Sequence, residues 1–339
     1  MALLIAEQVP LRTLTTLKVG GNAAYVTEIT TEEELVEAIK WAKERGCPYA
    51  VIGGGSNVLA HDEGYEGLLI RMRSDGVAIK EEDHTHALIT VSAGTDFDGF
   101  VSYAVEHGLW GVENLSHIPG TVGATPVQNV GAYGVEVKDC IESVRAYNTD
   151  METFQTLSTK ECAFGYRHSL FKTPEGKKYI VTSVTFRLSK LPDPKLSYKD
   201  LVAYFQNAEP SIAEIRAAII AIRAQKFPDW RHIGTAGSFF KNPVVSKEKF
   251  AELKERYPEL PGFAAEGGSI KLSLGFILDK ILHVRGYREG NVGTYEKQAL
   301  VLIAYENATA HEVAAFAEGI VDRVQHKLGI TIEWEVTRV

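Results

Sequence analysis

The chain of 339 residues has few cysteines, and the three that it has, Cys47, Cys140 and Cys162, lie far apart. An odd number of widely spaced cysteines without a C-x-x-C pair argues against a disulfide framework. We interpret all three as buried thiols. Neither an H-E-x-x-H motif nor a Cys/His cluster nor an acidic cage occurs, so the sequence predicts no metal site.

Long apolar runs are also missing. No segment approaches the ~18 consecutive apolar residues of a membrane span, and the apolar start Met1–Ala6 is too short for a secretory signal before Glu7 ends it. Lysine and arginine form no cluster, and the net charge of −8 argues against a nucleic-acid partner. We therefore expect a cytoplasmic protein that binds neither membranes nor nucleic acids.

Internal repeats are absent too, and the composition is that of an ordinary globular protein, with 45% apolar and 24% charged residues. The length suggests two or three domains. A capping-box pattern of Thr31 and Glu34 predicts the start of an amphipathic helix, which Gly46 ends. The apolar strand Tyr49–Ile52 follows and leads into the glycine turn 53–57. This order predicts α/β architecture with ligands at the carboxyl end of the strand.

The glycine turn reads G-G-G-S-N from Gly53 to Asn57. It is not the dinucleotide fingerprint, because no helical pattern follows directly, and it is not a P-loop, because the terminal Lys-Ser/Thr is missing. On its own, a triple glycine is explained most simply as a tight turn.

The stretch Asn114–Gly134 contains no Lys, Arg, Asp or Glu and carries glycines at 120, 123, 131 and 134 and prolines at 119 and 126. This spacing forbids a long helix or a central strand. Apolar residues such as Ile118 and Val122 argue against a solvated linker. Two interpretations have equal weight. Either the main chain approaches a ligand and offers its N–H groups to phosphate, or the stretch is a tight crossover loop in a large core.

The second half of the chain has a different texture. Leu191–Lys195 is a rigid, proline-containing connector, and Ser211–Lys226 is a strong amphipathic helix. We therefore place the main domain boundary within 190–226. The apolar pattern predicts a helix over Ile270–Leu282 and a strand over Ile330–Val336.

Several single residues could carry chemistry, and each has a plain alternative. Arg167 lies among aromatic residues and suits a carboxylate in a partly dry site, but a surface arginine with a packed stem is as common. Ser238 lacks a G-x-S-x-G context and would serve as an acid, a hydrogen-bond donor or a nucleophile. Glu335 is more often a solvated strand residue than a catalytic acid. The residues alone indicate an α/β protein with a glycine-rich, phosphate-contacting site and a second domain.

In their order, these segments resemble the UDP-N-acetylenolpyruvoylglucosamine reductase (MurB) family, flavin enzymes of bacterial peptidoglycan precursor synthesis. Six segments carry the resemblance over nearly the whole chain. They are G-G-G-S-N-V-L from Gly53, I-P-G-T-V-G-A from Ile118, Q-N-V-G-A-Y-G from Gln128, Y-R-H-S from Tyr166, A-G-S-F-F-K-N-P from Ala236 and E-V at Glu335. Ser197–Leu201 resembles the tyrosine-bearing loop of one class of the family, whereas Trp334 stands where members often carry proline.

The resemblance implies an α/β (α+β) fold class. It implies an FAD-binding fold of the vanillyl-alcohol-oxidase (PCMH) type in two subdomains plus a smaller α/β substrate-binding domain. We expect the FAD-binding domain over 17–190, with subdomains at about 1–73 and 74–200. The substrate-binding domain is expected over 201–320, and 321–339 as a strand that returns toward the flavin domain.

The resemblance also implies the NADPH-dependent reduction of UDP-N-acetylglucosamine enolpyruvate to UDP-N-acetylmuramate through non-covalent FAD, by a monomer. Hydride passes from flavin N5 to the enolpyruvyl C3, and Ser238 supplies a proton to C2. Arg167 and Glu335 stabilise the charge that spreads into the substrate carboxylate. The implied substrate-binding residues are Tyr198, Lys226 and Asn242. The implied cofactor-binding residues are Gly53, Gly54, Gly55, Ser56, Asn57, Gly120, Gly123, Ala124 and Gly131.

Two other functions stay open for these residues. One is a flavin-dependent alcohol or sugar oxidase of the same fold, which would turn over with oxygen and without NADPH. The other is a non-catalytic nucleotide-sugar binding protein that has lost the flavin, which would purify colourless.

Overall fold

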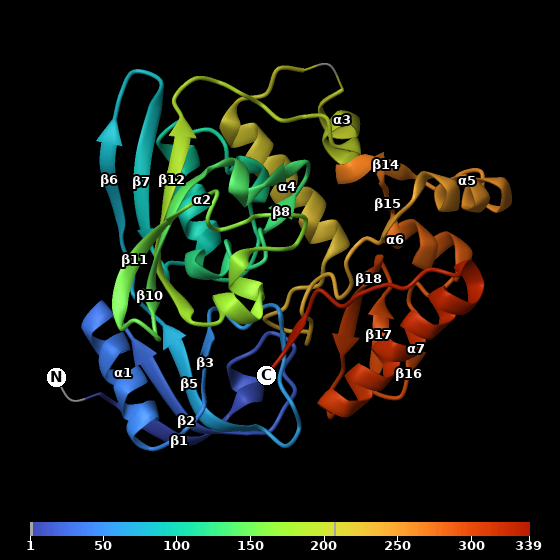
Figure 1. Ribbon diagram of the computed structural model, residues 1–339. Helices are drawn as coiled ribbons and strands as arrows, with labels where there is room; N and C mark the ends of the chain where they lie inside the picture. The colour runs from blue at the N-terminus through green and yellow to red at the C-terminus, as the bar shows by residue number, and fades with distance from the viewer. Residues whose placement is uncertain (1–2, 207) are drawn as a thin grey trace. The chain divides into compact units, whose positions relative to one another are not determined.

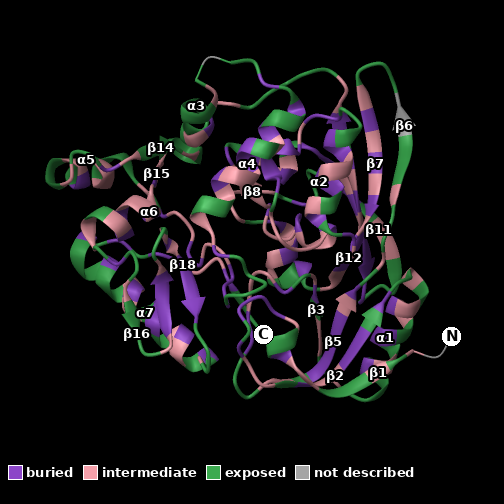
Figure 2. Cartoon of the chain, turned by 180° about the vertical axis from the view of Figure 1, so that it is seen from behind, coloured by how far each residue is buried: buried purple, intermediate pink, exposed green. Residues whose placement is uncertain are grey.

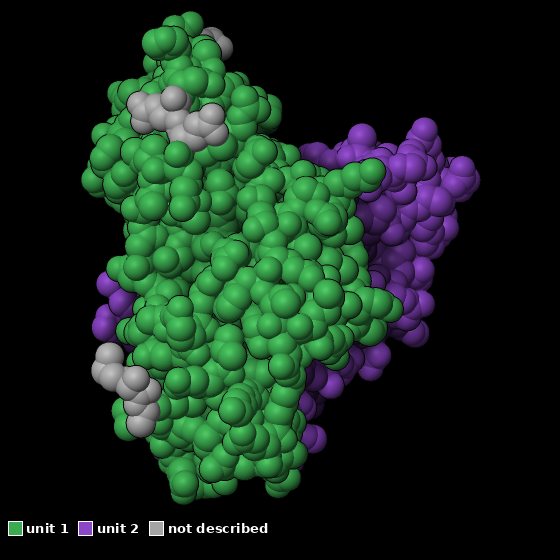
Figure 3. All heavy atoms as spheres, turned by 60° about the vertical axis from the view of Figure 1, so that its left-hand side comes forward, with its two compact units in different colours: residues 1–9, 23–55, 66–223 green, residues 10–22, 56–65, 224–339 purple. Residues whose placement is uncertain are grey.

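The computed structural model describes residues 3–206 and 208–339, apart from the side chains of residues 81–82. The chain divides into two compact units (Figure 1), which Figure 3 colours separately. Unit 1 comprises residues 1–9, 23–55 and 66–223, and unit 2 comprises residues 10–22, 56–65 and 224–339. Both units are therefore built from discontinuous segments of the chain.

The first sheet of unit 1 has four strands in the order β1-β2-β5-β3. They are β1 (Ile5–Pro10), β2 (Asn22–Ile29), β3 (Tyr49–Ile52) and β5 (Tyr65–Met72). Helix α1 (Glu32–Glu44) connects β2 to β3, and β3 runs parallel to β5. Thr31 and Glu34 form the capping box at the start of α1, which confirms the prediction. The carboxyl end of β3 leads into the glycine turn.

The second sheet of unit 1 has five strands in the order β11-β10-β12-β7-β6. They are β6 (Val77–Glu82), β7 (His86–Ser92), β10 (Ile141–Asn148), β11 (Thr153–Ser158) and β12 (Tyr179–Ser189), and each neighbouring pair is antiparallel. Helix α2 (Phe97–Glu106) follows β7. One apolar cluster joins both sheets with α1 and α2 through residues such as Leu68, Val91 and Phe100. Figure 2 shows the buried residues of the chain in purple. The two sheets of unit 1 therefore share one core.

A smaller apolar cluster in unit 1 packs α3 (Lys199–Phe205) and α4 (Ile212–Lys226) against Tyr133 of the central glycine stretch. Ser211 and Glu214 cap the start of α4 reciprocally. The helix predicted over Ser211–Lys226 is thus confirmed. Its last three residues belong to unit 2.

Unit 2 contains three small sheets. The first sheet consists of β13 (Val244–Val245), β15 (Ile270–Leu272) and β14 (Gly262–Ala264). The second consists of β16 (Arg288–Glu289), β17 (Val292–Tyr295) and β18 (Gln298–Ala304). The third pairs β19 (Thr337–Arg338) with β4 (Val58–Leu59). Helices α5 (Lys247–Arg256), α6 (Leu274–Phe276) and α7 (Ala310–Leu328) accompany them. Leu274, Leu302 and Phe316 belong to the apolar core of this unit.

The remaining short elements are the hairpin β8 (Gly131–Ala132) and β9 (Val135–Glu136) and eight short helical turns. These turns are Leu11–Thr13, Glu113–Leu115, Val122–Ala124, Val137–Asp139, Leu170–Lys172, Pro174–Gly176, Glu266–Gly268 and Ile277–Ile281. Among the described residues, no helix is both long and apolar enough to cross a membrane.

Two local predictions are wrong. The first part of the helix predicted over Ile270–Leu282 is strand β15, because Ile270 and Lys271 pair with strands on both sides. The strand predicted over Ile330–Val336 is reduced to an isolated bridge between Trp334 and Phe240. In both places the apolar pattern marks buried residues, but pairing partners elsewhere in the chain decide the backbone. The domain ranges 17–190, 201–320 and 321–339 remain predictions.

Glu32 ties the start of α1 to the second sheet. Its carboxylate accepts hydrogen bonds from Arg145 Nε at 2.8 Å, Arg145 Nη2 at 2.9 Å and Thr182 Oγ1 at 2.7 Å. The contact with Arg145 holds the pKa of Glu32 below its usual value. Such a carboxyl stabilises the fold above its unfolded-state pKa of about 4.3, and the contribution is lost as the pH falls through the folded-state pKa.

We predict that Glu32→Gln lowers the free energy of unfolding at pH 7 by about 1 kcal/mol, because both partners stay partly exposed to solvent. The difference from the parent protein should shrink as the pH falls toward about 3. Urea unfolding at both pH values measures it. Glu44→Gln, which removes the exposed partner of Lys40 at 3.8 Å, is the control and should change little. An equal deficit of Glu32→Gln at both pH values would contradict the assignment.

Candidate active site

Buried amide side chains hold the central uncharged stretch in place. Asn114 Nδ2 donates to the main-chain oxygens of Tyr133 at 2.9 Å and Lys195 at 2.8 Å. Asn129 Nδ2 donates to the main-chain oxygen of Gly165 at 2.9 Å. Both asparagines are fully buried. Hydrogen bonds from the side chains of Asn114 and Asn129 therefore hold the main chain of this stretch in its conformation.

The two glycine loops of unit 1 touch each other. A β-carbon on Gly54 would lie 2.8 Å from Gly120 Cα, and one on Gly53 would lie 2.5 Å from Thr121 Oγ1. A β-carbon on Gly123 would lie 2.6 Å from its nearest neighbour. We predicted that these glycines let the main chain approach a ligand. In the structure, Gly53 and Gly54 first of all let one loop approach the other, and Gly123 lets the second loop approach Ala93.

The first loop also presents unused donors. Among residues 3–206 and 208–339, no acceptor takes a hydrogen bond from the amide of Gly54 or Gly55. Gly55 is buried and has a φ of +64°. Adjacent amides that lack acceptors in a left-handed turn are suited to an anionic oxygen. The loop thus fits the phosphate groups of a bound cofactor.

Arg167 places its guanidinium on the second half of the central stretch. Nη2 donates to the Gly131 oxygen at 2.7 Å and Nη1 to the Asn129 oxygen at 3.4 Å. Arg167 has a φ of +51°, and its guanidinium lies 5.6 Å from the centre of the Tyr166 ring. The side chain is half-buried. The cation is therefore held among aromatic and main-chain groups, as a carboxylate-binding arginine requires.

Tyr198 precedes α3, and its ring meets that of Tyr133 edge-on at 5.3 Å. Burial raises the pKa of Tyr133 to about 12, and the Tyr133 hydroxyl accepts a hydrogen bond from Arg223. Burial also lowers the pKa of Arg223. We did not predict a role for Arg223. The signal that could have indicated it is the pair Arg216 and Arg223, seven residues apart on one face of a largely apolar helix.

The backbone segments that carry Ser238 and Glu335 pair with each other in unit 2, although they are far apart in sequence. The Glu335 amide donates to the Phe239 oxygen at 2.8 Å, and the Lys241 amide donates to the Glu333 oxygen at 2.9 Å. These bonds pair the segment after Ser238 with the C-terminal segment. A hydroxyl and a carboxyl are thereby placed on neighbouring backbone segments.

The two glutamates that flank Trp334 differ in their exposure to solvent and in their partners. The side chain of Glu333 is 73% exposed and forms an ion pair with Lys241 Nζ at 2.7 Å. Glu335 is half-buried. Trp334 packs edge-on against Phe239 with ring centres 5.0 Å apart. This arrangement supports Glu335, rather than Glu333, as the candidate acid.

The end of the glycine turn belongs to unit 2 and holds the Glu335 segment. Asn57 Nδ2 donates to the Glu335 oxygen at 3.0 Å, and the Asn57 oxygen accepts from the Thr337 amide at 3.1 Å. Ser56 is half-buried beside it. The role that the structure gives Asn57 is thus a contact with the candidate acid segment, in addition to the cofactor contact that we predicted.

The remaining predicted residues lie in less distinctive surroundings. Asn242 Oδ1 accepts from the Leu274 amide at 3.0 Å at the start of α6. Lys226 is half-buried at the end of α4. Ala124 and Gly131 are half-buried in the central stretch. None of these contacts identifies a ligand by itself.

The described residues contain no group of three or more His, Cys, Asp or Glu that could hold a metal ion. The cysteines form no disulfide. Burial raises the pKa of Cys140 and of Cys162 to about 12, so neither thiol is a nucleophile near neutral pH.

Each unit thus brings part of the predicted set together. Unit 1 joins the glycine loops to each other and Arg167 to Gly131. Unit 2 joins Asn57 to the Glu335 segment and pairs that segment with the backbone that follows Ser238. A cation fixed by main-chain oxygens suits a carboxylate, and hydroxyl and carboxyl groups are the kinds that transfer protons. Unit 1 thus offers groups suited to phosphate and carboxylate binding, and unit 2 offers a hydroxyl and a carboxyl suited to proton transfer.

Comparison with known proteins is consistent with this chemistry. The model of an FAD binding domain matches residues 23–156. The model of the C-terminal domain of UDP-N-acetylenolpyruvoylglucosamine reductase matches residues 228–339.

Full-length relatives carry the same name. The UDP-N-acetylenolpyruvoylglucosamine reductase of Chromobacterium violaceum is 39% identical over 339 residues, which cover 99% of each chain. That of Cupriavidus pinatubonensis is 42% identical over 330 residues, which cover 97% of each chain. The crystal structure of the reductase from Thermus caldophilus is similar with a TM-score of 0.69 and 26% identity, over 100% of this chain and 99% of the other.

We predict that Gly54→Ala lowers the free energy of unfolding by on the order of 1–3 kcal/mol, the cost of an added group that forces the backbone to shift. The new β-carbon would meet Gly120 Cα at 2.8 Å, and main chain cannot move aside as a flexible side chain can. Thermal unfolding measures the change. Gly319→Ala in α7, where a β-carbon meets nothing within 4 Å, is the matched control and should stabilise slightly. A Gly54→Ala protein as stable as the parent would refute the loop contact.

Proposed function

Because the chain belongs to the UDP-N-acetylenolpyruvoylglucosamine reductase family, we propose that it reduces UDP-N-acetylglucosamine enolpyruvate to UDP-N-acetylmuramate with electrons from NADPH. The observation that carries the proposal is the 39% identity to a named reductase over the full length of both chains. The protein is an FAD-dependent oxidoreductase of peptidoglycan precursor synthesis. We further propose that it works as a cytoplasmic monomer.

FAD is the cofactor, and the glycine loops fit it. The Gly54 and Gly55 amides, which lack acceptors in the described part of the chain, would bind phosphate oxygens together with Gly53, Ser56 and Asn57. The second loop, Gly120–Ala124, and Gly131 would complete the contacts. Bound FAD supplies the hydride that reduces the enolpyruvyl double bond. We propose that it is held without a covalent bond, since the groups proposed to contact it are mostly main-chain amides of the glycine loops.

Arg167 and Glu335 would act on the substrate carboxylate. As C3 of the enolpyruvyl group accepts hydride, negative charge develops on C2 and spreads into that carboxylate. A guanidinium that main-chain oxygens already hold needs little reorganisation to stabilise this charge. Glu335, in its protonated form, would donate a hydrogen bond to the same group. Its backbone is fixed by Asn57 and Phe239.

Ser238 would protonate C2. A serine hydroxyl is a weak acid, so its contribution depends on geometry and on a relay such as an ordered water. The hydrogen bond between the Phe239 oxygen and the Glu335 amide fixes the backbone next to the hydroxyl. Tyr198, Lys226 and Asn242 would bind the diphosphate of the nucleotide. Tyr198 is 43% exposed and therefore open to a ligand.

Two rival functions make opposite predictions. An oxidase of the same fold would consume oxygen with an alcohol or sugar and would not need NADPH. A nucleotide-sugar binding protein would contain no flavin. The full-length relatives favour the reductase over both.

We predict that the purified protein is yellow and that anaerobic NADPH bleaches it. UDP-N-acetylglucosamine enolpyruvate should then restore the flavin absorption, because the enzyme passes its electrons to this substrate. Acid precipitation should leave the yellow colour in the supernatant, because the flavin is not covalently bound. Restoration by oxygen alone, without any effect of the enolpyruvyl sugar, would favour the oxidase.

A second prediction separates the two half-reactions. Ser238→Ala should leave the reduction of FAD by NADPH close to normal, since this step needs no proton at C2. Reoxidation by the enolpyruvyl sugar should slow by a factor of ~100 or more. Stopped-flow absorbance measures both rates, and Ser246→Ala, which alters a serine at the N-terminus of α5, is the control. Equal slowing of both half-reactions would assign Ser238 a structural role.

A further inference from the structure

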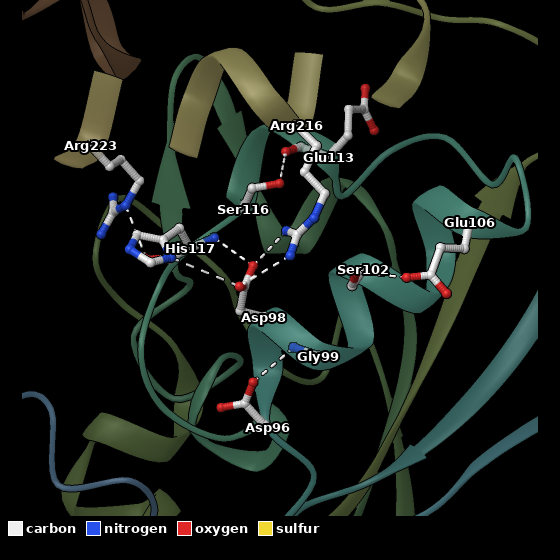
Figure 4. A network of polar contacts seen from close by, with 10 residues as sticks. All are labelled: Asp96, Asp98, Gly99, Ser102, Glu106, Glu113, Ser116, His117, Arg216 and Arg223. Atoms are coloured by element: carbon white, nitrogen blue, oxygen red, sulfur yellow. Dashed lines mark hydrogen bonds and ion pairs between the residues drawn. The ribbon is translucent and has the colours of Figure 1, made fainter. Parts of the chain in front are cut away.

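A polar network between α2 and α4 holds the residue that precedes the second glycine loop. Figure 4 shows Asp98 of α2 pointing toward Arg216 of α4 and toward the backbone of His117. His117 has a φ of +62°. A residue with a β-carbon is strained in this left-handed conformation, and it persists only where its surroundings fix it. The loop Ile118–Ala124 begins directly after it.

Both polar groups of the His117 main chain are held by side chains. The amide donates to Asp98 Oδ1 at 2.6 Å, and the carbonyl oxygen accepts from Arg223 Nε at 3.1 Å. Donor and acceptor are therefore fixed from α2 and from α4. The imidazole itself is exposed, and its Nδ1 lies 4.0 Å from Asp98 Oδ2. The network thus acts on the backbone of His117 more than on its ring.

Arg216 fixes the Asp98 carboxylate in turn. Its Nη1 donates to Oδ1 at 2.6 Å and its Nη2 to Oδ2 at 3.1 Å. The two side chains are 15% and 26% exposed. Burial alone would raise the pKa of Asp98, but the hydrogen bonds from Arg216 and from the His117 amide outweigh it and lower the pKa. The carboxylate is therefore charged and oriented by a bidentate partner.

The first turn of α2 meets the glycine loop at a second place. The Phe97 amide donates to the Gly120 oxygen at 3.1 Å, and Asp96 forms a bridge with Thr121. The turn of α2 thus contacts the loop at its entry, through Asp98, and at its centre. Gly120 is the residue whose main chain touches Gly54. A shift of the loop entry would consequently move Gly120 against the first loop.

We propose that Asp98 and Arg216 are positioning residues for FAD, which act through the backbone of His117. They hold the entry of the second glycine loop in its left-handed conformation and so keep the two loops spaced for the cofactor. The proposal rests on the assignment of FAD to these loops under the proposed function. Neither residue needs to touch the cofactor.

The alternative is that the ion pair only fastens α4 to α2. In that case, breaking it would lower the stability of the protein with and without FAD by the same amount, and the affinity for FAD would not change. A positioning role predicts a loss of affinity that the stability of the FAD-free protein does not explain. The two roles therefore differ in a measurable quantity.

The test uses the full chain with three variants and a control. Asp98→Ala removes the acceptor of the His117 amide, and Asp98→Asn keeps an acceptor but removes the charge. Arg216→Met removes the cation and its two hydrogen bonds to Asp98. Glu106→Gln is the control, because Glu106 is an exposed acid on the same helix that contacts Ser102. FAD is removed, and the dissociation constant for added FAD is measured by flavin fluorescence. Thermal unfolding of the FAD-free proteins and the visible spectrum of the bound flavin are recorded in parallel.

We expect the dissociation constant for FAD to rise on the order of tenfold or more in Asp98→Ala, as for the loss of a hydrogen bond to a charged group. Arg216→Met and Asp98→Asn should show smaller increases, and Glu106→Gln none. The flavin spectrum should shift in the variants that weaken binding. If Asp98→Ala does not fold, Asp98→Asn and Arg216→Met decide, since both keep the side-chain volume.

Unchanged affinities in all three variants, with lower melting temperatures, would overturn the positioning role and leave a simple link between helices. The positioning role would also be overturned if each variant lost FAD affinity only in proportion to the stability that its FAD-free form had lost. A parent protein that binds no FAD would instead overturn the proposed function, and this inference with it. A parent protein that binds FAD while the variants bind it equally well would leave the proposed function intact.

Discussion

The contact between the main chains of Gly54 and Gly120 is the constraint on which unit 1 depends, because it leaves no room for a β-carbon on Gly54. Strand β3 delivers the first loop to this contact, and the first turn of α2 delivers the second, through the Phe97 amide and Asp98. The shared core of the two sheets keeps both elements in place. The strained turn at His117 is held by hydrogen bonds to both of its main-chain polar groups, so a loop without regular structure keeps a defined entry.

In unit 2 the corresponding constraint is main-chain pairing. Two backbone hydrogen bonds join the segment after Ser238 to the segment around Glu335, and Asn57 holds the latter from the other side. Side chains on paired backbone segments keep their separation better than side chains on free loops, which is what proton transfer requires. The C-terminal segment thereby serves the candidate site without forming the continuous strand that we predicted.

Much of this could be predicted because the signals are local. The capping box of α1, the apolar face of the helix after Ser211 and the glycine loops each leave a pattern within a few residues. The family resemblance rests on such short segments in order, and relatives over the full length confirm it. The network of Asp98, Arg216 and Arg223 escaped prediction, because two arginines seven residues apart on a helix do not reveal which acid or backbone group they face.

The sequence by itself determined the family, the α/β character, the helices with clear caps and the residues that are candidates for chemistry. Only the tertiary structure decided which of them meet. It assigned Gly53–Gly55 to one unit and Ser56 and Asn57 to the other, and it made Ile270–Leu272 a strand. The physical reason is that contacts between distant segments depend on packing and on pairing partners, which leave no periodic trace in the segment itself. A local pattern such as a capping box, in contrast, depends only on residues a few positions apart, so it can be recognised in the sequence itself.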